Sequence, residues 1–346
     1  MREINVVGGR ISPDQLGRTM MHEHLVVGLP GWELDVAHPG PTFRDALAVC
    51  VDRISELKDA GVRSFVDPCP TDLGRDAKLA GEVAARTGMQ IVLATGLFCE
   101  LHAGGAYWRA KVAAAAAAGQ DAAPYIAELF VKEIEEGIGD SGVRAGIIKV
   151  ATDVGQVTPY ERAIFKAAAI ASQATGVPIT THTQQGELGL EQQAILTGHG
   201  VPACQLVIGH SDGSPDHHYH LGVIDGGSYL GFDRWGYQTG RYGRPDEDKI
   251  ASLMQIVRAR DARQVVVACD HVCCYRGSAW PPVDSVKDDE SYNILHFVRN
   301  IAPRLKAAGL SQADLDLLTI ENPRRYFSAS APGAQENANE GAAAEA

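Results

Sequence analysis

Short β-branched segments alternate with helix-like segments along almost the whole chain, and this alternation constrains the fold more than any other feature of the sequence. Eight candidate strands, each ending in polar residues, occupy Thr19–His24, Arg63–Pro68, Ile91–Gly96, Ala145–Ala151, Pro178–Thr183, Leu206–Asp212, Tyr229–Trp235 and Val265–His271. Apolar residues with helical spacing lie between most of them, over Phe43–Ala60, Ala77–Thr87, Tyr125–Gly137, Pro159–Thr175, Leu188–Gly198 and Glu247–Arg260. Repeated strand–helix units predict an α/β protein whose parallel sheet closes into a (β/α)₈ TIM barrel. The alternative is an open doubly wound sheet, but no Gly-x-Gly-x-x-Gly turn follows the first candidate strand.

The length of the chain raises the question of how many domains this pattern forms. A chain of 346 residues suggests about two domains, although (β/α)₈ barrels often form large single domains. No Pro/Ser-rich linker divides the sequence, so we expect a single barrel domain over residues 1–328. Residues 329–346 carry no apolar side chain larger than alanine, and we expect them to form a disordered Ala/Glu-rich tail. The alanine run Ala113–Ala118 is expected to be a helix or a loosely held insertion.

Charge and cysteine content exclude several classes of protein. The 31 Lys and Arg residues against 43 Asp and Glu residues give a formal net charge of −12, so the chain lacks the basic excess that binds nucleic acid or an anionic membrane. Its seven cysteines are an odd number in a long chain, which suits a reducing compartment better than a disulfide framework. The sequence shows no signal-peptide-like segment and no run of about 18 apolar residues, so we expect a cytoplasmic protein without a membrane partner.

Polar residues stand at the ends of the predicted strands, where the active sites of such barrels assemble. His22 and His24 are two residues apart, so on a strand their imidazoles would share one face and could grip one metal ion. The other residues in such positions are Lys149, His182, His210 and Asp270. Each of these residues alone has a structural explanation, such as a buried hydrogen bond or a helix cap. Together they supply the donors that zinc and similar divalent ions prefer, and we interpret them as one metal site.

Seven segments extend this pattern into a resemblance to a known family. They are Gly9–Ile11, Met20–His24, Arg144–Lys149, Thr180–Thr183, Ile208–Asp212, Gly231–Arg234 and Glu321–Phe327. With these segments the chain up to about Phe327 resembles the phosphotriesterase family of the amidohydrolase superfamily, and within it the phosphotriesterase-like lactonases. The resemblance implies a zinc-dependent hydrolase that attacks lactones, carboxylic esters or organophosphate triesters with a hydroxide held between two metal ions. Cobalt, manganese and iron are the alternative metals.

The resemblance also implies a role for each residue of the site. The more buried ion would take His22, His24 and Asp270, the more exposed ion would take His182 and His210, and Lys149, carboxylated on its amine, would bridge them. Such a centre would supply a nucleophile at neutral pH, because two metal ions lower the pKa of bound water. Since members of the family often form homodimers, we expect a homodimer here.

A proton relay is a further implication of the resemblance. Asp270 would accept a proton and pass it outward past Arg234 towards Asp212. An arginine side chain stays protonated and is therefore a poor proton carrier. The alternative role of Arg234 is a structural salt bridge with Asp233 or Asp212.

Aromatic residues in the loops after the strands are candidates for the substrate pocket. Phe98 stands where the lactonases have a tyrosine after the third strand, so the hydroxyl that helps to position the ring is missing. The other candidates, in the seventh and eighth loops, are Trp235, Tyr237, Tyr275 and Trp280. They could form an aromatic wall for an apolar acyl or aryl group, or they could serve only for packing.

Other polar clusters are expected to take no part in the chemistry. His217, His218 and His220 are interpreted as a solvated loop, Cys273–Cys274 as packing residues, and Asp246–Asp248 and Asp288–Glu290 as solvated acidic runs. Acidic runs at the mouth of the site would disfavour anions. We therefore expect a small neutral ester or lactone as the substrate.

Two other functions compete with hydrolysis. A lysine on a barrel strand is also typical of a Schiff-base aldolase, in which Lys149 would attack a carbonyl substrate. The four histidines have no purpose in that mechanism. A non-catalytic metal-binding barrel is the second alternative, and the complete set of ligands argues against it.

Overall fold

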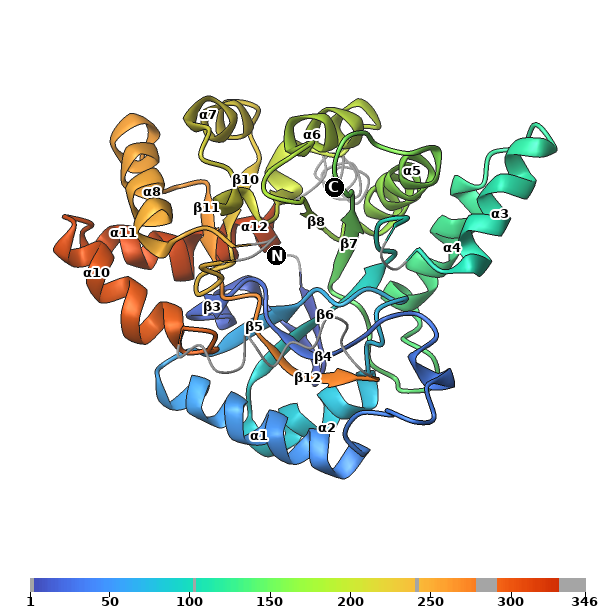
Figure 1. Cartoon of the computed structure of the whole chain (residues 1–346), viewed down its shortest axis with the longest axis horizontal. Helices are drawn as coiled ribbons and strands as arrows, with labels where there is room; N and C mark the ends of the chain where they lie inside the picture. Colours follow the sequence, from blue (N-terminus) through green and yellow to red (C-terminus); the bar gives the residue numbers. More distant parts are fainter. Residues whose placement is uncertain (1–2, 102–103, 240–242, 278–290, 330–346) are drawn as a thin grey trace, which may run out of the picture.

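Eight parallel strands form the centre of the molecule, and helices surround them (Figure 1). The computed structural model describes residues 3–101, 104–239, 243–277 and 291–329. The strands are β3 (Thr19–Met20), β5 (Ser64–Asp67), β6 (Gln90–Gly96), β7 (Ile147–Ala151), β8 (Ile179–His182), β9 (Leu206–Ile208), β10 (Tyr229–Phe232) and β11 (Val265–Val267). They pair in parallel in the order β11-β10-β9-β8-β7-β6-β5-β3. The Met21 amide donates to the Val267 carbonyl at 3.0 Å and so joins the two edges, which confirms the predicted TIM barrel.

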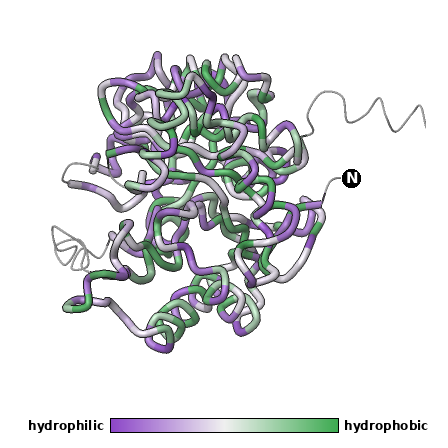
Figure 2. Tube along the Cα trace, turned by 90° about the vertical axis from the view of Figure 1, so that its right-hand side faces the viewer, coloured by the Kyte–Doolittle hydropathy of each residue, from purple (hydrophilic) through white to green (hydrophobic). Residues whose placement is uncertain are grey.

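The predicted helices lie on the outside of this barrel. They are α1 (Phe43–Asp59), α2 (Ala77–Thr87), α4 (Ala123–Glu135), α5 (Pro159–Thr175), α6 (Gly189–Gly198) and α8 (Asp246–Arg260). The bounds of α5 match the prediction because Thr158 forms a capping box at its start and Gly176 ends it at a φ of 72°. Hydrophobic and hydrophilic residues alternate along α1 and α2 at the bottom of Figure 2, as expected for helices with one buried face.

Several further helices complete the ring. They are α3 (Ala106–Ala117), α7 (His217–Asp225), α10 (Ala302–Ala307), α11 (Gln312–Asp316) and α12 (Asn322–Ser328). α3 contains most of the alanine run, buries none of its residues and projects from the body of the molecule (Figure 1). Of the two expectations for the alanine run, the structure shows the helix. Among the described helices, none is both long and apolar enough to span a bilayer.

The predicted first strand is broken in the structure. β3 ends at Met20, and a separate strand, β4 (His24–Gly28), begins at His24 and pairs in parallel with β12 (Val272–Arg276). The prediction of one continuous strand over Thr19–His24 was therefore wrong, because the chain bends at Met21 and His22. This bend leaves His22 and His24 at the carboxyl end of the barrel wall, beside the end of β11.

The barrel interior is apolar in the layers near the end at which the strands begin. Alternate strand residues point inward, so Val66 and Val92 pack in the interior while Phe65 and Ile91 pack against the helices. The antiparallel hairpin of β1 (Ile4–Val6) and β2 (Gly9–Ile11) closes the end at which the strands begin, together with Phe327 of α12. The candidate ligands lie at the other end of the barrel, where the strands finish.

Candidate metal centre

The six candidate ligands all lie at the carboxyl end of the barrel and are all buried. His22 and His24 come from the bend between β3 and β4, Lys149 lies within β7, His182 ends β8, and His210 and Asp270 follow β9 and β11. None of these side chains is exposed by more than a tenth, although all six are polar or charged groups that water would otherwise solvate. Their burial together indicates a built site rather than a solvated surface.

Asp270 lies between the imidazoles. Its Oδ1 is 3.4 Å from His22 Nε2 and 3.2 Å from His24 Nε2, and its Oδ2 is 3.9 Å from His210 Nε2. The ring centroids of His182 and His210 are 4.5 Å apart, and Lys149 Nζ is 3.4 Å from His22 Nε2. The structure therefore brings all six predicted residues around one space.

Two carboxylates that sequence reasoning missed orient three of the histidines. Asp233 accepts from His210 Nδ1 at 2.8 Å and lies 3.3 Å from His22 Nδ1, while Asp67 lies 3.0 Å from His24 Nδ1. An ionised carboxylate can only accept a hydrogen bond, so each Nδ1 carries a proton, and the neutral rings of His22 and His210 present the lone pair of Nε2 to the central space. The signal available in the sequence was that Asp67 and Asp233 also stand at strand ends, but each was read only as part of its strand or as a partner of Arg234.

The donor set fits divalent metal ions. His182 Nε2 and His210 Nε2 are buried and have no hydrogen-bond partner among the described residues. A buried acceptor left in this state costs roughly 1–3 kcal/mol, which coordination of a metal ion would offset. His22, His24 and Asp270 also place one ligand atom each within 4.8 Å of one another. Imidazole and carboxylate ligands suit zinc, cobalt, manganese and iron.

The electrostatics of the site favour neutral imidazoles. Burial lowers the pKa of His22 to about 3 and that of His210 to about 4, and it holds the pKa of His182 well below its ordinary value. Burial opposes the charge of Asp270 as well, but the neighbouring His22 and His210 keep its pKa well below the usual range. A neutral histidine and an ionised aspartate are the forms that bind a metal ion.

His24 and Lys149 differ from this pattern. Burial opposes a charge on His24, but its hydrogen bonds with Asp270 and Asp67 outweigh burial and raise its pKa well above the ordinary value. Burial lowers the pKa of Lys149 to about 8, so a fraction of its amine is uncharged near neutral pH. Lys149 Nζ also donates to the Thr181 carbonyl at 3.2 Å.

The backbone is strained at two of the ligands. His210 and Asp270 have φ angles of 57° and 52°, a region that costs a residue other than glycine of the order of 1–3 kcal/mol. Glu23 holds Asp270 in place, because its two carboxylate oxygens accept the amides on either side, from Cys269 at 2.7 Å and from His271 at 2.9 Å. Sequence reasoning assigned no role to Glu23, since its partners lie almost 250 residues away in the chain.

The contacts of Arg234 differ from the predicted salt bridge. Arg234 Nε donates to Asp270 Oδ2 at 2.9 Å, whereas Asp212 Oδ2 accepts the backbone amide of Arg234 at 3.1 Å. The described ion pair of Arg234 is therefore with Asp270 rather than with Asp233 or Asp212. The proton relay from Asp270 past Arg234 to Asp212 remains a prediction. The described contact between Arg234 and Asp212 involves the backbone amide of Arg234 and not its side chain.

The candidate pocket aromatics divide into three groups. Phe98 packs edge-on against His182 with ring centroids 4.8 Å apart, and Tyr237 donates its hydroxyl to the Asp270 carbonyl at 2.8 Å. Tyr275 contacts this group through Tyr292, a residue that the sequence analysis missed, with the two hydroxyl oxygens 3.4 Å apart. Trp235 is fully buried between Phe232 and Phe297, so its prediction as a pocket wall was wrong and it is a core residue. Trp280 lies outside the described residues.

Two clusters that the sequence analysis set aside are structured. His217, His218 and His220 lie on α7 rather than in a solvated loop, because Asp216 caps that helix, and His220 is buried with Nε2 2.9 Å from the Ser211 carbonyl. Asp246 is also buried rather than solvated, because it pairs with His296 at 2.8 Å.

The remaining predictions about these clusters have mixed outcomes. Glu247 and Asp248 are exposed as expected, Cys274 is buried on β12 and Cys273 is partly buried beside it. Asp288–Glu290 lies outside the described residues.

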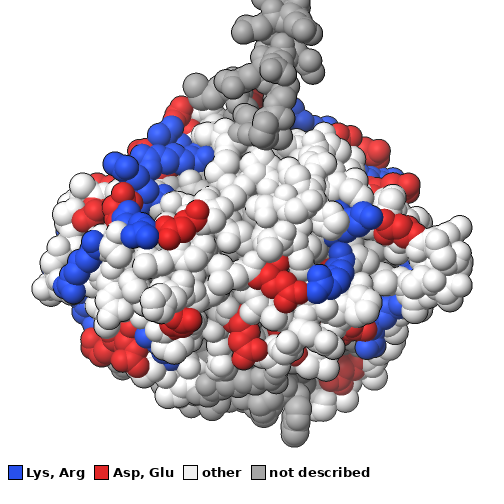
Figure 3. Space-filling model, turned by 90° about the horizontal axis from the view of Figure 1, so that it is seen from above, with Lys and Arg blue, Asp and Glu red and all other residues white. Residues whose placement is uncertain are grey.

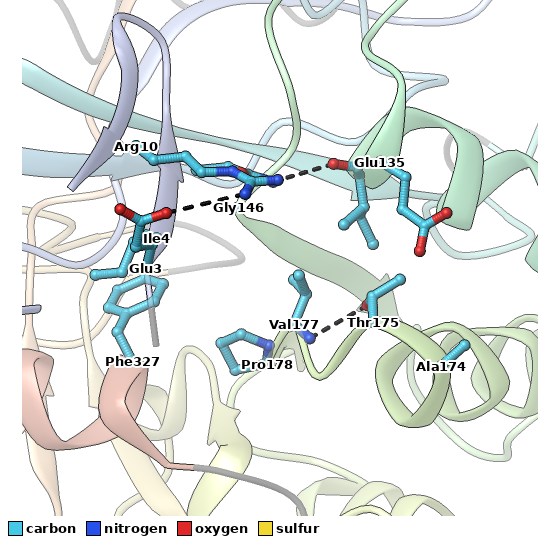
Figure 4. Close-up of a pocket in the computed structure, with 12 residues that line it drawn as sticks. Glu3, Ile4, Arg10, Glu135, Gly146, Ala174, Thr175, Val177, Pro178 and Phe327 are labelled. Carbon is cyan, nitrogen blue, oxygen red and sulfur yellow. Dashed lines mark hydrogen bonds and ion pairs between the residues drawn. The ribbon is translucent and has the colours of Figure 1, made fainter. Parts of the chain in front are cut away.

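A cavity of about 660 Å³ lies at the opposite end of the barrel (Figure 4). Its lining includes Gly146 and Pro178, which directly precede β7 and β8, and Phe327 of α12. Two of its charged residues form a pair, as Arg10 lies 3.9 Å from Glu3. No candidate ligand lines this cavity, and active sites of such barrels lie at the carboxyl end of the strands.

Comparisons with known proteins agree with this geometry. The model of the phosphotriesterase family matches residues 2–327. A phosphotriesterase homology protein of Mycobacterium tuberculosis is 33% identical over 328 residues, which cover 94% of this chain and 98% of the relative. An aryldialkylphosphatase of Saccharolobus solfataricus is 28% identical over 322 residues, with 92% and 97% covered. The solved structure of a mutant phosphotriesterase-like lactonase from Deinococcus radiodurans superposes with a TM-score of 0.86 at 34% identity, covering 94% of this chain and 99% of that one.

Proposed function

This chain belongs to the phosphotriesterase family, and from that premise we propose that it is a binuclear metal-dependent hydrolase of lactones and carboxylic esters. Organophosphate triesters are a further candidate substrate class, since an aryldialkylphosphatase and a phosphotriesterase-like lactonase are both similar to this chain. The observation that carries the proposal is the convergence of three buried imidazoles, those of His22, His24 and His210, on Asp270, with the His182 ring packed beside that of His210. Carboxylates hold the Nδ1 atoms of the first three rings.

The proposed ligands divide between two ions. His22, His24 and Asp270 would hold one ion and His182 and His210 the other, with Lys149 carboxylated on Nζ between them. Zinc is the first metal to test, then cobalt, manganese and iron. The lowered pKa of Lys149 supports the carboxylation, because only an uncharged amine can attack CO₂. When bound, the ions would make a water molecule nucleophilic near neutral pH and would polarise the C=O or P=O bond of the substrate.

The protein's own residues would manage the proton and the substrate. The Asp270 carboxylate would accept the proton released by the nucleophile, and Arg234 Nε would orient the Oδ2 atom that does so. Arg234 itself remains protonated, so it would position the Asp270 carboxylate and would not carry the proton. Phe98 would give the substrate an apolar contact next to His182 but could not donate a hydrogen bond to it.

A hydrolysis panel tests the proposal. The metal-loaded protein is assayed with lactones of varied ring and tail, aryl esters and a phosphotriester, and we expect turnover of a lactone or an ester. Asp270→Asn should abolish that turnover while the protein stays folded by circular dichroism. Turnover that survives both Asp270→Asn and chelators, combined with borohydride trapping of substrate on Lys149, would instead support the Schiff-base aldolase. Two bound ions without hydrolysis of any substrate would support a non-catalytic barrel.

We also propose that the chain forms a homodimer and acts in the cytoplasm on a small neutral substrate, without nucleic acid or membrane partners. Leu34 and Val36, in the segment after β4, are 84% and 87% exposed and could lie in a contact between two copies. None of the seven cysteines, all of which lie in the described part of the chain, forms a disulfide, which suits a reducing compartment. Light scattering of Leu34→Glu against the unaltered protein tests the dimer, and cell fractionation tests the location.

A further inference from the structure

A buried ammonium group lies behind the site, outside the set of ligands. Lys249, on α8, is 1% exposed, and its Nζ donates to the carbonyl oxygens of Arg234 and Tyr237, the latter at 3.0 Å. It also lies 3.5 Å from Asp246 Oδ1 and 3.7 Å from Asp212 Oδ2, both of which are buried. A charge buried this deeply persists only because it is paired and hydrogen-bonded.

The two carbonyls belong to the two residues that contact Asp270 from the seventh loop. Arg234 Nε donates to Asp270 Oδ2 at 2.9 Å, and the Tyr237 hydroxyl donates to the Asp270 carbonyl at 2.8 Å. Lys249 thus fixes both ends of the segment Arg234–Tyr237, and each end places one side chain on Asp270. A single ammonium therefore binds both residues through which the seventh loop contacts the carboxylate and the backbone carbonyl of Asp270.

The surroundings of Lys249 keep it in this position. Asp246 accepts the Gly236 amide at 3.1 Å from the same segment and is itself held by His296 at 2.8 Å. The Ser291 hydroxyl donates to the Gly236 carbonyl at 3.0 Å. Stability alone gives no reason for a lysine here, because apolar residues often replace buried ion pairs at no cost in stability. An ammonium group that donates to two carbonyl oxygens fixes the position of their backbone more narrowly than an apolar side chain in the same space would.

We propose that Lys249 is a positioning residue of the hydrolase, which sets the segment Arg234–Tyr237 so that Arg234 and Tyr237 hold Asp270 in its working orientation. The proposal rests on the function proposed above for the same site. Among the described residues Lys249 has no contact with a proposed metal ligand, and it acts through Arg234 and Tyr237, with Asp212, its ion-pair partner, accepting the Arg234 amide.

The primary test compares Lys249→Met with the unaltered protein. Methionine fills a similar volume but donates no hydrogen bond, so Asp270 should lose its orientation. We expect kcat to fall about tenfold to a hundredfold while KM changes less than about threefold, because misplacement of a catalytic group by about 1 Å has effects of this size. The affinity for zinc, measured by competition with a chelator, should fall about tenfold or more, as is usual when groups that orient metal ligands are removed.

Gln193→Met is the matched control. Gln193 is buried on α6, and its Nε2 donates to the Val223 carbonyl at 2.9 Å and to the Ser228 hydroxyl at 2.7 Å, beside the start of β10 and far from the ligands. This variant also exchanges a buried donor for methionine, so it should lower the melting temperature and leave kcat and zinc affinity unchanged. An equal loss of kcat in Gln193→Met would contradict a specific role for Lys249.

A double-mutant cycle tests the route of the effect. If Lys249 acts in part through Tyr237, Lys249→Met should cost markedly less in a Tyr237→Phe background than in the unaltered protein. Fully additive losses would overturn the proposal, as would kcat and zinc affinity within about twofold of the unaltered protein in folded Lys249→Met.

Folding and function can be separated in the same experiment. If Lys249→Met does not fold, Lys249→Gln, which keeps one donor group, should show an intermediate loss in both readouts. Failure of both variants to fold would assign Lys249 a purely structural role and overturn the proposal. If the unaltered protein binds zinc but hydrolyses nothing, the proposed function fails, and the zinc-affinity comparison still decides the role of Lys249.

Discussion

Asp233 shows how single residues prepare the centre. Its two carboxylate oxygens contact His210 and His22 on their Nδ1 atoms, and one of them also accepts the His210 backbone amide at 2.9 Å. One side chain therefore fixes the tautomer and the ring direction of one proposed ligand for each ion. The neighbouring His22 and His210 lower the pKa of Asp233, although burial alone would raise it.

Asp233→Asn should weaken metal binding at both positions. The amide keeps the volume but offers only one acceptor oxygen, so at least one imidazole loses its orientation. We expect zinc affinity to fall about tenfold to a hundredfold in chelator competition. Asp225→Asn is the control, because Asp225 is half exposed and pairs with Arg260 at the surface, where such a pair contributes little. Unchanged affinity in Asp233→Asn would show that Asp233 does not orient the ligands.

Carboxylation of Lys149 should depend on pH in the metal-free protein. Burial lowers its pKa from 10.5 to about 8, so the uncharged amine that reacts with CO₂ increases as the pH rises through 8. About a tenth of the amine is uncharged at pH 7 and about three quarters at pH 8.5, which predicts faster carboxylation at the higher pH when the concentration of dissolved CO₂ is kept equal. Carbon-13 NMR with labelled bicarbonate measures the carbamate signal, which Lys149→Met should lack. A rate independent of pH over this range would contradict the expectation.

At the scale of elements, the ends of the strands decide the site. β9 stops at Ile208 although the sequence suggested a strand to Asp212, because His210 takes a left-handed backbone conformation that no strand can continue. Strand-end residues therefore leave the wall of the barrel and turn inward. This turn places His210 against Asp233 and away from the helices.

The sequence predicted the barrel and its helices well where local signals agree. The capping box of Thr158 and the stop at Gly176 determine the bounds of α5, and both are visible in the sequence. The break between β3 and β4 was missed, because pairing of β4 with β12 joins segments about 250 residues apart. α7 was missed because its histidines read as a polar loop.

The site was predictable only in part, because some of its contacts also join segments that lie far apart in the sequence. Residues at strand ends, such as His182 and Asp270, follow from topology. The roles of Asp67, Glu23 and Lys249 depend on which side chains meet across different elements, and no local pattern in a single sequence carries that information.

Gly96 tests the contact between β6 and β7. Its φ is 123°, and a Cβ there would lie 1.9 Å from the carbonyl oxygen of Lys149, with which it pairs in register. Gly96→Ala should therefore destabilise the protein by more than about 2 kcal/mol and displace Lys149. Urea denaturation measures the free energy of unfolding. Gly81→Ala, in α2 with open space around it, should instead stabilise by roughly 0.5–1 kcal/mol. Equal effects of the two substitutions would contradict the packing described for β6.

At the scale of the whole molecule, the two ends of the barrel have different tasks. The polar centre lies where the strands finish, and the apolar interior with its closing hairpin lies where they begin. Both acidic and basic side chains are present on the face seen in Figure 3. The net charge of −12 describes the whole surface and not the centre, where two divalent ions would add positive charge.

Asn5 tests this division of tasks. It is buried in the closing hairpin and donates to the carbonyls of Ile134 at 3.1 Å and Ala145 at 2.9 Å. Asn5→Ala leaves both carbonyls without this donor and should lower the free energy of unfolding by about 1–3 kcal/mol. Because the hairpin lies at the far end of the barrel, kcat measured below the unfolding transition should stay unchanged. A large loss of kcat in the folded variant would show that the two ends are coupled.

Metal titration of the metal-free protein tests the central claim most directly. The protein is stripped with a chelator, supplied with bicarbonate and titrated with zinc or cobalt while hydrolysis of its best lactone or ester is followed. The six buried ligands predict negligible activity without metal and a rise that saturates at two equivalents per chain. Full hydrolysis by the stripped protein, or activity that does not respond to added metal, would contradict the assignment of these residues as a binuclear centre.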